Sequence, residues 1–249
     1  MDTRNHKTLS ISLLMVLTTV IAFSVNSASI SNDIYQAAIG NKNRMPGDVV
    51  NDVKRNPLAI LPFTQIEEGN KVLELGSGGG YTTELVSWVV GDSGHVYAHF
   101  LYNTERLKDK RLDNVTALRE HSLDELAEVL HENKIEENQL DAVIIFFVLH
   151  DIYLNNEMSE ELLSTLYTVL KPGGKLIILD NAAKPESGLS HIGDLHRIGE
   201  NFVKSEIIKA GFAFDESTDV LRNKDDDHTR PWGTFEGLQD RFALRFKKQ

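Results

Sequence analysis

Residues 72–80 limit the possible folds of this chain more than any other segment. An apolar stretch that ends in Glu74 and Leu75 is followed by a turn with four glycines in five positions, and a helix is expected to start near Tyr81. Glycine reaches positive φ without steric cost, and it lets a ligand approach bare main chain. The segment therefore predicts a strand, a turn and a helix that together hold a small molecule.

Two common nucleotide-binding loops do not match this turn. A dinucleotide-binding loop has the spacing Gly-x-Gly-x-x-Gly, and aligning its first two glycines with Gly76 and Gly78 puts Tyr81 in the third position. A P-loop needs Gly-Lys-Ser/Thr at the start of the helix, whereas the first lysine after these glycines is Lys108. The turn therefore argues against nicotinamide dinucleotides, ATP and GTP.

The spacing Glu-x-Gly-x-Gly-x-Gly, from Glu74 to Gly80, resembles motif I of the class I S-adenosylmethionine (SAM)-dependent methyltransferases. Residues 139–151 (QLDAVIIFFVLHD) look like the fourth strand of that family, and residues 170–180 (LKPGGKLIILD) look like its fifth strand with the preceding turn. Long apolar runs of this kind are typical of central parallel strands that are buried on both faces. The resemblance covers roughly residues 45–249.

The resemblance implies a Rossmann-like α/β fold of the class I methyltransferase type. We therefore expect a mostly parallel seven-stranded sheet with an antiparallel edge hairpin and helices on both faces. It also implies transfer of a methyl group from SAM to a small molecule.

The resemblance further implies which residues hold SAM. The family usually ends its second strand with an acid that binds both ribose hydroxyls, but here Phe100 follows residues 95–99 and cannot accept a hydrogen bond. Asn103 or His99 would have to substitute for that acid. The amino-acid part of SAM would contact the carboxylate of Glu74 and the main chain of the turn, at Gly76, Ser77, Gly78 and Gly80.

Polar residues follow three of the expected strands. In open α/β sheets, ligands bind outside the carboxyl ends of the strands, so these residues are expected to meet in one crevice. Methyl transfer requires an acceptor placed against the sulfonium methyl group, and a base if the acceptor carries a proton. The candidates for direct chemistry are His150, Asp151, His196 and His228.

Asp180 and Asn181, together with Asp151, also resemble the metal ligands of catechol-type methyltransferases. Oxygen ligands suit Mg²⁺ or Mn²⁺. In the alternative, Asp180 only caps a loop and residues 225–227 form a solvated turn. If histidines from the later loops were added as ligands, the site would favour Zn²⁺ or Fe²⁺; these histidines are His191, His196 and His228.

The first 28 residues have the pattern of a secretory signal peptide. Arg4 and Lys7 give a basic start, residues 11–25 are mostly apolar, and small residues occupy positions 27–29. An uncleaved membrane anchor is the alternative, although a spanning helix needs about 20 apolar residues. We expect a periplasmic or secreted protein without stable membrane insertion after cleavage. The expected parts are the signal peptide (1–28), an N-terminal helical lid or brace (29–66) and a methyltransferase-like domain (67–249).

The chain is acidic, with 37 Asp and Glu against 26 Lys and Arg and a formal charge of −11. Such a surface repels phosphate backbones, so a small molecule and not nucleic acid is the expected partner. Two other function classes stay open. One is a metal-assisted enzyme of another class on the same fold, and the other is a non-catalytic small-molecule-binding protein that has lost the use of SAM.

Overall fold

The computed structural model describes residues 27–118, 122–155, 158–234 and 238–249. The predicted signal peptide lies almost wholly outside these residues, so it stays a prediction. In the part of the chain that is described, no helix combines the length and the hydropathy needed to cross a bilayer.

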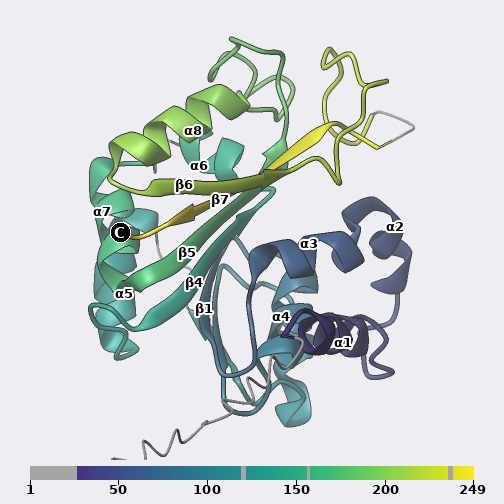
Figure 1. The fold of residues 1–249 in the computed structure, drawn as a ribbon, viewed down its shortest axis with the longest axis vertical. Helices are drawn as coiled ribbons and strands as arrows, with labels where there is room; N and C mark the ends of the chain where they lie inside the picture. The colour runs from purple at the N-terminus through teal and green to yellow at the C-terminus, as the bar shows by residue number, and fades with distance from the viewer. Residues whose placement is uncertain (1–26, 119–121, 156–157, 235–237) are drawn as a thin grey trace, which may run out of the picture.

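The described strands form a single seven-stranded sheet in the order β3-β2-β1-β4-β5-β7-β6 (Figure 1). Strands β1 to β5 pair in parallel, and β7 is antiparallel to both β5 and β6. The mostly parallel sheet and its antiparallel edge hairpin are both confirmed: β6 and β7 form the hairpin, with β7 next to β5 and β6 at the edge. The strands are β1 (Lys71–Leu75), β2 (His95–His99), β3 (Val115–Leu118), β4 (Leu140–Phe146), β5 (Leu170–Asn181), β6 (Ala213–Thr218) and β7 (Arg241–Lys247).

Helices cover both faces of the sheet (Figure 1). One face carries α5 (Leu126–Glu132), α6 (Leu149–Leu154), α7 (Glu160–Val169) and α8 (Glu200–Lys209). The other face carries α1 (Ser27–Ile39), α3 (Pro57–Thr64) and α4 (Tyr81–Val90). The remaining short helices are α2 (Asp52–Arg55), η1 (Val49–Asn51), η2 (Thr104–Lys110) and η3 (Leu123–Glu125).

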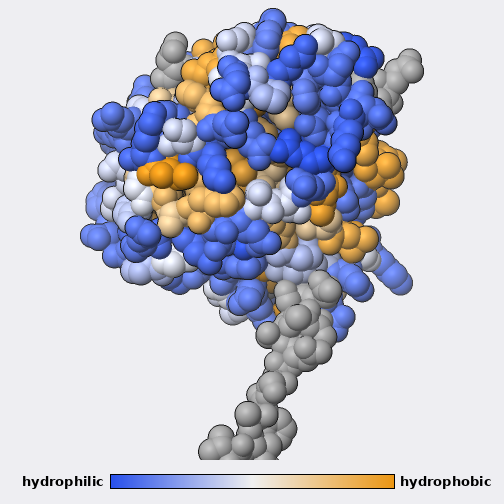
Figure 2. Space-filling model, turned by 45° about the horizontal axis from the view of Figure 1, so that its top comes forward, coloured by the Kyte–Doolittle hydropathy of each residue, from blue (hydrophilic) through white to orange (hydrophobic). Residues whose placement is uncertain are grey.

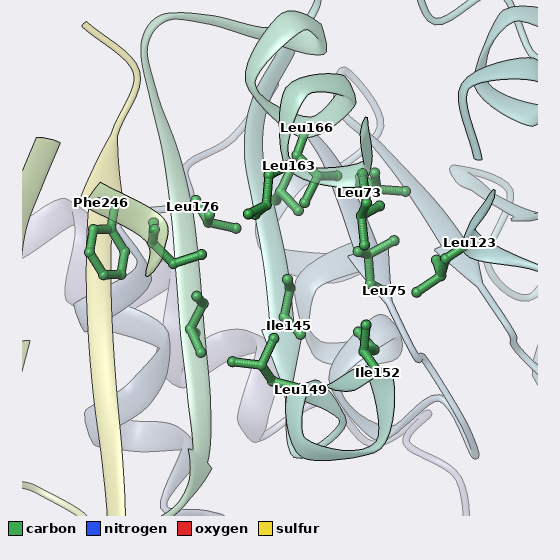
Figure 3. Packing of buried hydrophobic residues seen from close by; sticks show 14 of the residues in the cluster. Leu73, Leu75, Leu123, Ile145, Leu149, Ile152, Leu163, Leu166, Leu176 and Phe246 are labelled. Carbon is green, nitrogen blue, oxygen red and sulfur yellow. The ribbon is translucent and has the colours of Figure 1, made fainter. Parts of the chain in front are cut away.

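The alternation of side chains along the strands produces two apolar layers. In β1, Leu73 and Leu75 face the layer under α5 to α8, whereas Val72 faces the layer under α1, α3 and α4. Figure 3 shows Leu149 and Leu166, from α6 and α7, directed toward the side chains of the central strands. Because both faces are buried, the central strands are apolar throughout, as expected from the sequence.

The N-terminal helices belong to the second apolar layer. Tyr35 of α1 and Ile60 of α3 are buried there, and the hydroxyl of Tyr35 donates to the carbonyl of Ile66 at 2.9 Å. Asp48 forms an ion pair with Arg106 at 2.9 Å, which connects this segment to the loop after β2. These contacts favour a brace over a mobile lid, although the boundary at residue 66 stays a prediction.

The face seen in Figure 2 is mostly hydrophilic, with separate hydrophobic areas. Several large apolar side chains are exposed at separate positions, including Phe100, Tyr102 and Trp232. The first two follow β2, at the carboxyl edge of the sheet, where ligands bind in folds of this kind.

Candidate functional site

The glycine turn after β1 joins this strand to α4, as predicted, but its glycines serve different purposes. Gly76, Gly78 and Gly80 all have positive φ, at 69°, 56° and 78°. A Cβ atom on Gly76 would lie 2.7 Å from a methyl group of Val148, and one on Gly80 would lie 2.6 Å from the side chain of Arg106. These two glycines are therefore required by packing within the protein.

The main chain at Gly78 and Gly79 is less crowded. A Cβ atom on Gly78 would meet its nearest neighbour, the ring of Tyr102, at 3.7 Å, and one on Gly79 would meet the Tyr102 hydroxyl at 3.4 Å. The loop after β2 fixes this part of the turn, because the Gly78 amide donates to the Phe100 carbonyl at 3.1 Å. The predicted cradle thus narrows to Gly78 and Gly79, beside the exposed ring of Tyr102.

Glu74 lies next to this turn and is almost fully buried, at 3% exposed. Its carboxylate accepts a 2.5 Å hydrogen bond from the Thr83 hydroxyl of α4. Burial raises the pKa of Glu74 to about 7, although hydrogen bonds from Thr83 and Ser77 and the charges of Arg55 and Arg106 act in the opposite direction. A carboxylate whose burial outweighs these groups is suited to receive a cationic ligand group.

Arg55 and Arg241 lie on the same side of the sheet, and neither was predicted from the sequence as a site residue. Their guanidinium groups lie 5.2 Å and 4.8 Å from the centre of the Phe147 ring. Burial lowers the pKa of Arg55, and burial together with the nearby charge of Arg55 lowers that of Arg241 to about 10. No carboxylate among the described residues forms an ion pair with either group, so this side of the crevice favours an anion.

Phe100, His99 and Asn103 lie at or just after the end of β2. Phe100 is 47% exposed and has a φ of 60°. His99 is buried, whereas Asn103 is half-buried and precedes η2. Whether Asn103 or His99 contacts a ribose stays a prediction, as do the contacts of Ser77 with a ligand.

The structure brings together three of the four residues predicted for direct chemistry. His150 and Asp151 lie at the start of α6, and His196 lies in the loop after β5. The Nε2 atom of His150 and the Nδ1 atom of His196 each lie 3.4 Å from Oδ1 of Asp151. We refer to His150, Asp151 and His196 as the histidine cluster.

Asp180, at the carboxyl end of β5, orients this cluster. Its buried carboxylate accepts hydrogen bonds from the main chain of His150 at 2.9 Å and of Asn181 at 2.7 Å, and from Nδ1 of His150 at 2.8 Å. Burial would lower the pKa of His150, but the hydrogen bond and charge of Asp180, with the charge of Asp151, raise it overall. Direct metal binding by Asp180 and Asn181, which was predicted from the sequence, stays untested.

His228 lies apart from the histidine cluster. Its Nε2 atom is 3.0 Å from Asp240, in a separate pocket of about 550 Å³ that Arg222 also lines. In the same loop, Asp226 is only 4% exposed and forms an ion pair with the fully buried Arg197 at 2.8 Å. The alternative of a solvated turn at residues 225–227 therefore fails for Asp226.

A hollow of about 820 Å³ lies away from this crevice. It is lined by residues such as His95, at the start of β2, and Gly91, which follows α4. These residues lie at the amino ends of the strands, whereas the glycine turn and the histidine cluster lie at the carboxyl ends. The carboxyl edge is therefore the candidate site because of the chemistry of its residues, and not because of the volume of a hollow.

Comparison with known proteins supports the same assignment. Residues 73–178, which extend from β1 to β5, match the family model described as "Methyltransferase domain". Residues 73–178 are thus those of a class I SAM-dependent methyltransferase domain, as the sequence predicted. The chain is 31% identical over 130 residues to the ubiquinone/menaquinone biosynthesis C-methyltransferase UbiE of Vibrio campbellii, a match that covers 51% of this chain and 48% of UbiE.

A second relative and a solved structure agree with this placement. UbiE of Blochmanniella floridana is 34% identical over 141 residues, covering 55% of this chain and 52% of the relative. The crystal structure of a SAM-dependent methyltransferase from Aquifex aeolicus superposes with a TM-score of 0.57 at 19% identity, covering 80% of this chain and 93% of that one. The chain thus spans about half the length of these UbiE relatives, and the solved structure supports the fold.

Proposed function

We propose that this chain transfers a methyl group from SAM to a small molecule. The observation that carries the proposal is the uncrowded main chain at Gly78 and Gly79, which lies beside a buried carboxylate. Gly78 has a positive φ, but neither Gly78 nor Gly79 has a packing reason to lack a side chain, so their main chain is open to a ligand.

The residues around this main chain suit the amino-acid part of SAM. Glu74 offers a negative charge to the ammonium group, and Arg55 offers a positive charge to the carboxylate. The charge of Arg55 lowers the pKa of Glu74 and the charge of Glu74 raises that of Arg55, so each group favours the ionised form of the other. When bound, SAM supplies the activated methyl group, and the protein positions it and excludes water.

The acceptor is proposed only as a small molecule. UbiE is named as a C-methyltransferase of quinone biosynthesis, and C-methylation is one candidate reaction here. His150, Asp151 and His196 are the groups that could take a proton from an acceptor at the neighbouring strand ends. The excess of acidic residues supports a partner other than nucleic acid.

Calorimetric titration of residues 29–249 with SAM, and with its demethylated product, tests this proposal. We expect binding in the micromolar range for both compounds. The Gly78→Ala variant should weaken this binding at least tenfold, because the added methyl group occupies the main-chain surface that the ligand needs.

Gly173→Ala is the matched control for this titration. Gly173 also has a positive φ, at 77°, but a Cβ atom there would meet nothing within 4 Å. The control therefore carries similar backbone strain without touching the crevice, and it should bind SAM as the unmodified chain does. Absence of SAM binding in the unmodified chain, or equal binding by both variants, would contradict the proposed function.

A further inference from the structure

The histidine cluster has features that acid-base chemistry alone does not require. Its three side chains come from two segments, the start of α6 and the loop after β5, and each of them offers one donor atom to the same point. These atoms, one each from His150, Asp151 and His196, all lie within 4.8 Å of one another.

The spacing of the donor atoms fits an ion better than direct hydrogen bonds. Both nitrogen-to-oxygen distances to Asp151 are 3.4 Å, which is longer than the roughly 2.7–3.2 Å of a normal hydrogen bond. Two ligand atoms that each lie about 2.1 Å from a tetrahedral zinc ion are about 3.4 Å apart. The two edges that end at Asp151 therefore have the length found in a coordination site.

The tautomer of His150 leaves a lone pair facing Asp151. Asp180 already accepts two main-chain N–H groups, and the Nδ1 atom of His150 donates a third hydrogen bond to it. In the neutral ring, Nε2 then presents a lone pair to the carboxylate of Asp151. Two lone pairs that face each other repel, and a proton or a metal ion between them removes this repulsion.

Asp180 also supplies the outer partner that metal-binding histidines usually have. Such histidines commonly donate their second ring N–H to a carboxylate, which fixes the ring and makes the coordinating nitrogen more basic. Here the carboxylate is fully buried and 2.8 Å from the ring. His150 is thus positioned with Nε2 directed at Asp151.

His196 gives independent support. Its Nδ1 atom is buried and has no hydrogen-bond partner among the described residues, and its main chain has a φ of 52°, which is uncommon outside glycine. Unfavourable backbone conformations of this kind cluster at binding sites. An unsatisfied buried nitrogen in such a conformation, 3.4 Å from a carboxylate, is accounted for by a bound cation.

We propose that His150, Asp151 and His196 bind a divalent transition metal ion, and that Asp180 positions His150 for this role. Two imidazoles and one carboxylate suit Zn²⁺ or Fe²⁺. The side chains of Asp151 and His196 are 41% and 36% exposed, so further coordination positions face the crevice and can take water or a ligand oxygen. The metal site does not depend on methyl transfer or on SAM.

Titration of the purified full-length chain with Co²⁺, after treatment with EDTA and without SAM, tests the metal site. We expect one Co²⁺ per chain, with visible absorption typical of four or five ligands, and displacement by one equivalent of Zn²⁺. His196→Gln and Asp151→Asn should each weaken binding at least tenfold. Both residues are partly exposed, so these variants should fold, which far-UV circular dichroism can check.

His191→Gln is the matched control, because His191 lies in the same loop and its Nδ1 atom is 3.2 Å from Asp194, outside the histidine cluster. This variant should bind Co²⁺ as the unmodified chain does. Less than a fifth of an equivalent bound, a spectrum typical of hydrated Co²⁺, or equal binding by His196→Gln would overturn the proposal. If less than a fifth of an equivalent of Co²⁺ binds, titration of the His150 ring in an NMR experiment would identify a proton as the cation between His150 and Asp151.

Discussion

At the residue scale, Glu74 should make stability depend on pH. Its pKa in the folded protein is about 7, above the 4.5 that is usual for a glutamate. Stability from this group is therefore fully present below pH 4.5 and is lost as the pH rises through 7, by about 3 kcal/mol in the free energy of unfolding. Glu74→Gln should raise the melting temperature more at pH 8 than at pH 5, and it should also remove SAM binding.

Thermal unfolding of the Glu74→Gln variant between pH 5 and pH 8 measures this effect. Glu128→Gln, which replaces an exposed acid on α5, is the control and should leave the pH profile unchanged. Identical pH profiles for the Glu74→Gln variant and the unmodified chain would show that Glu74 is not the group with the raised pKa.

The polar groups of the site could be predicted from the sequence, but their partners could not. Glu74, His150 and Asp180 follow recognisable strands, and strand ends meet at one edge of the sheet, so their proximity could be predicted. Thr83 contacts Glu74 from a helix face, and Arg55 acts on its pKa from a short helical segment that carries no motif, so neither could be predicted. Likewise, only the three-dimensional structure separates the glycines that packing requires from those that a ligand could require.

At the scale of elements, the central strands and the helix after the glycine turn followed from periodicity and turn signals. The position of β7 did not, because the sequence indicates an antiparallel pair of strands but not which of the two lies next to β5. The N-terminal helices were expected, yet their attachment to the second apolar layer depends on long-range contacts of residues such as Tyr35 and Ile60.

Removal of these helices should unfold the protein. A chain that starts at residue 67 would expose the apolar face of α4 that α1 and α3 cover, and would leave Arg106 without Asp48. We expect this truncated chain to aggregate or to lose cooperative thermal unfolding, whereas a chain that starts at residue 29 should unfold cooperatively. Equal melting temperatures for the two chains would instead show that residues 67–249 fold alone.

At the scale of the whole molecule, we propose that the protein is exported and processed. The basic start, the apolar run and the small residues at 27–29 are typical of a signal peptide. In fractionated bacteria that express the full chain, we expect a soluble periplasmic or secreted form whose N-terminal sequence begins at Ser29. Leu14→Arg should block export, because it places a charge in the apolar run.

Mass spectrometry of the two fractions distinguishes the alternatives. A full-length chain in the membrane fraction would indicate an uncleaved anchor. A full-length chain in the cytosol, with the same distribution for Leu14→Arg, would contradict export altogether.

The buried pair of Arg197 and Asp226 has a consequence for how molecules reach the crevice. Arg197 also donates to the carbonyls of Ala182 and Arg230, so it fastens the loop that carries His196 to two other segments. Opening this loop would leave a charge buried and unpaired, which is costly. We therefore expect molecules to enter and leave on the opposite side, past the exposed rings of Phe100 and Tyr102, and the movement of these two rings to limit the rate of exchange.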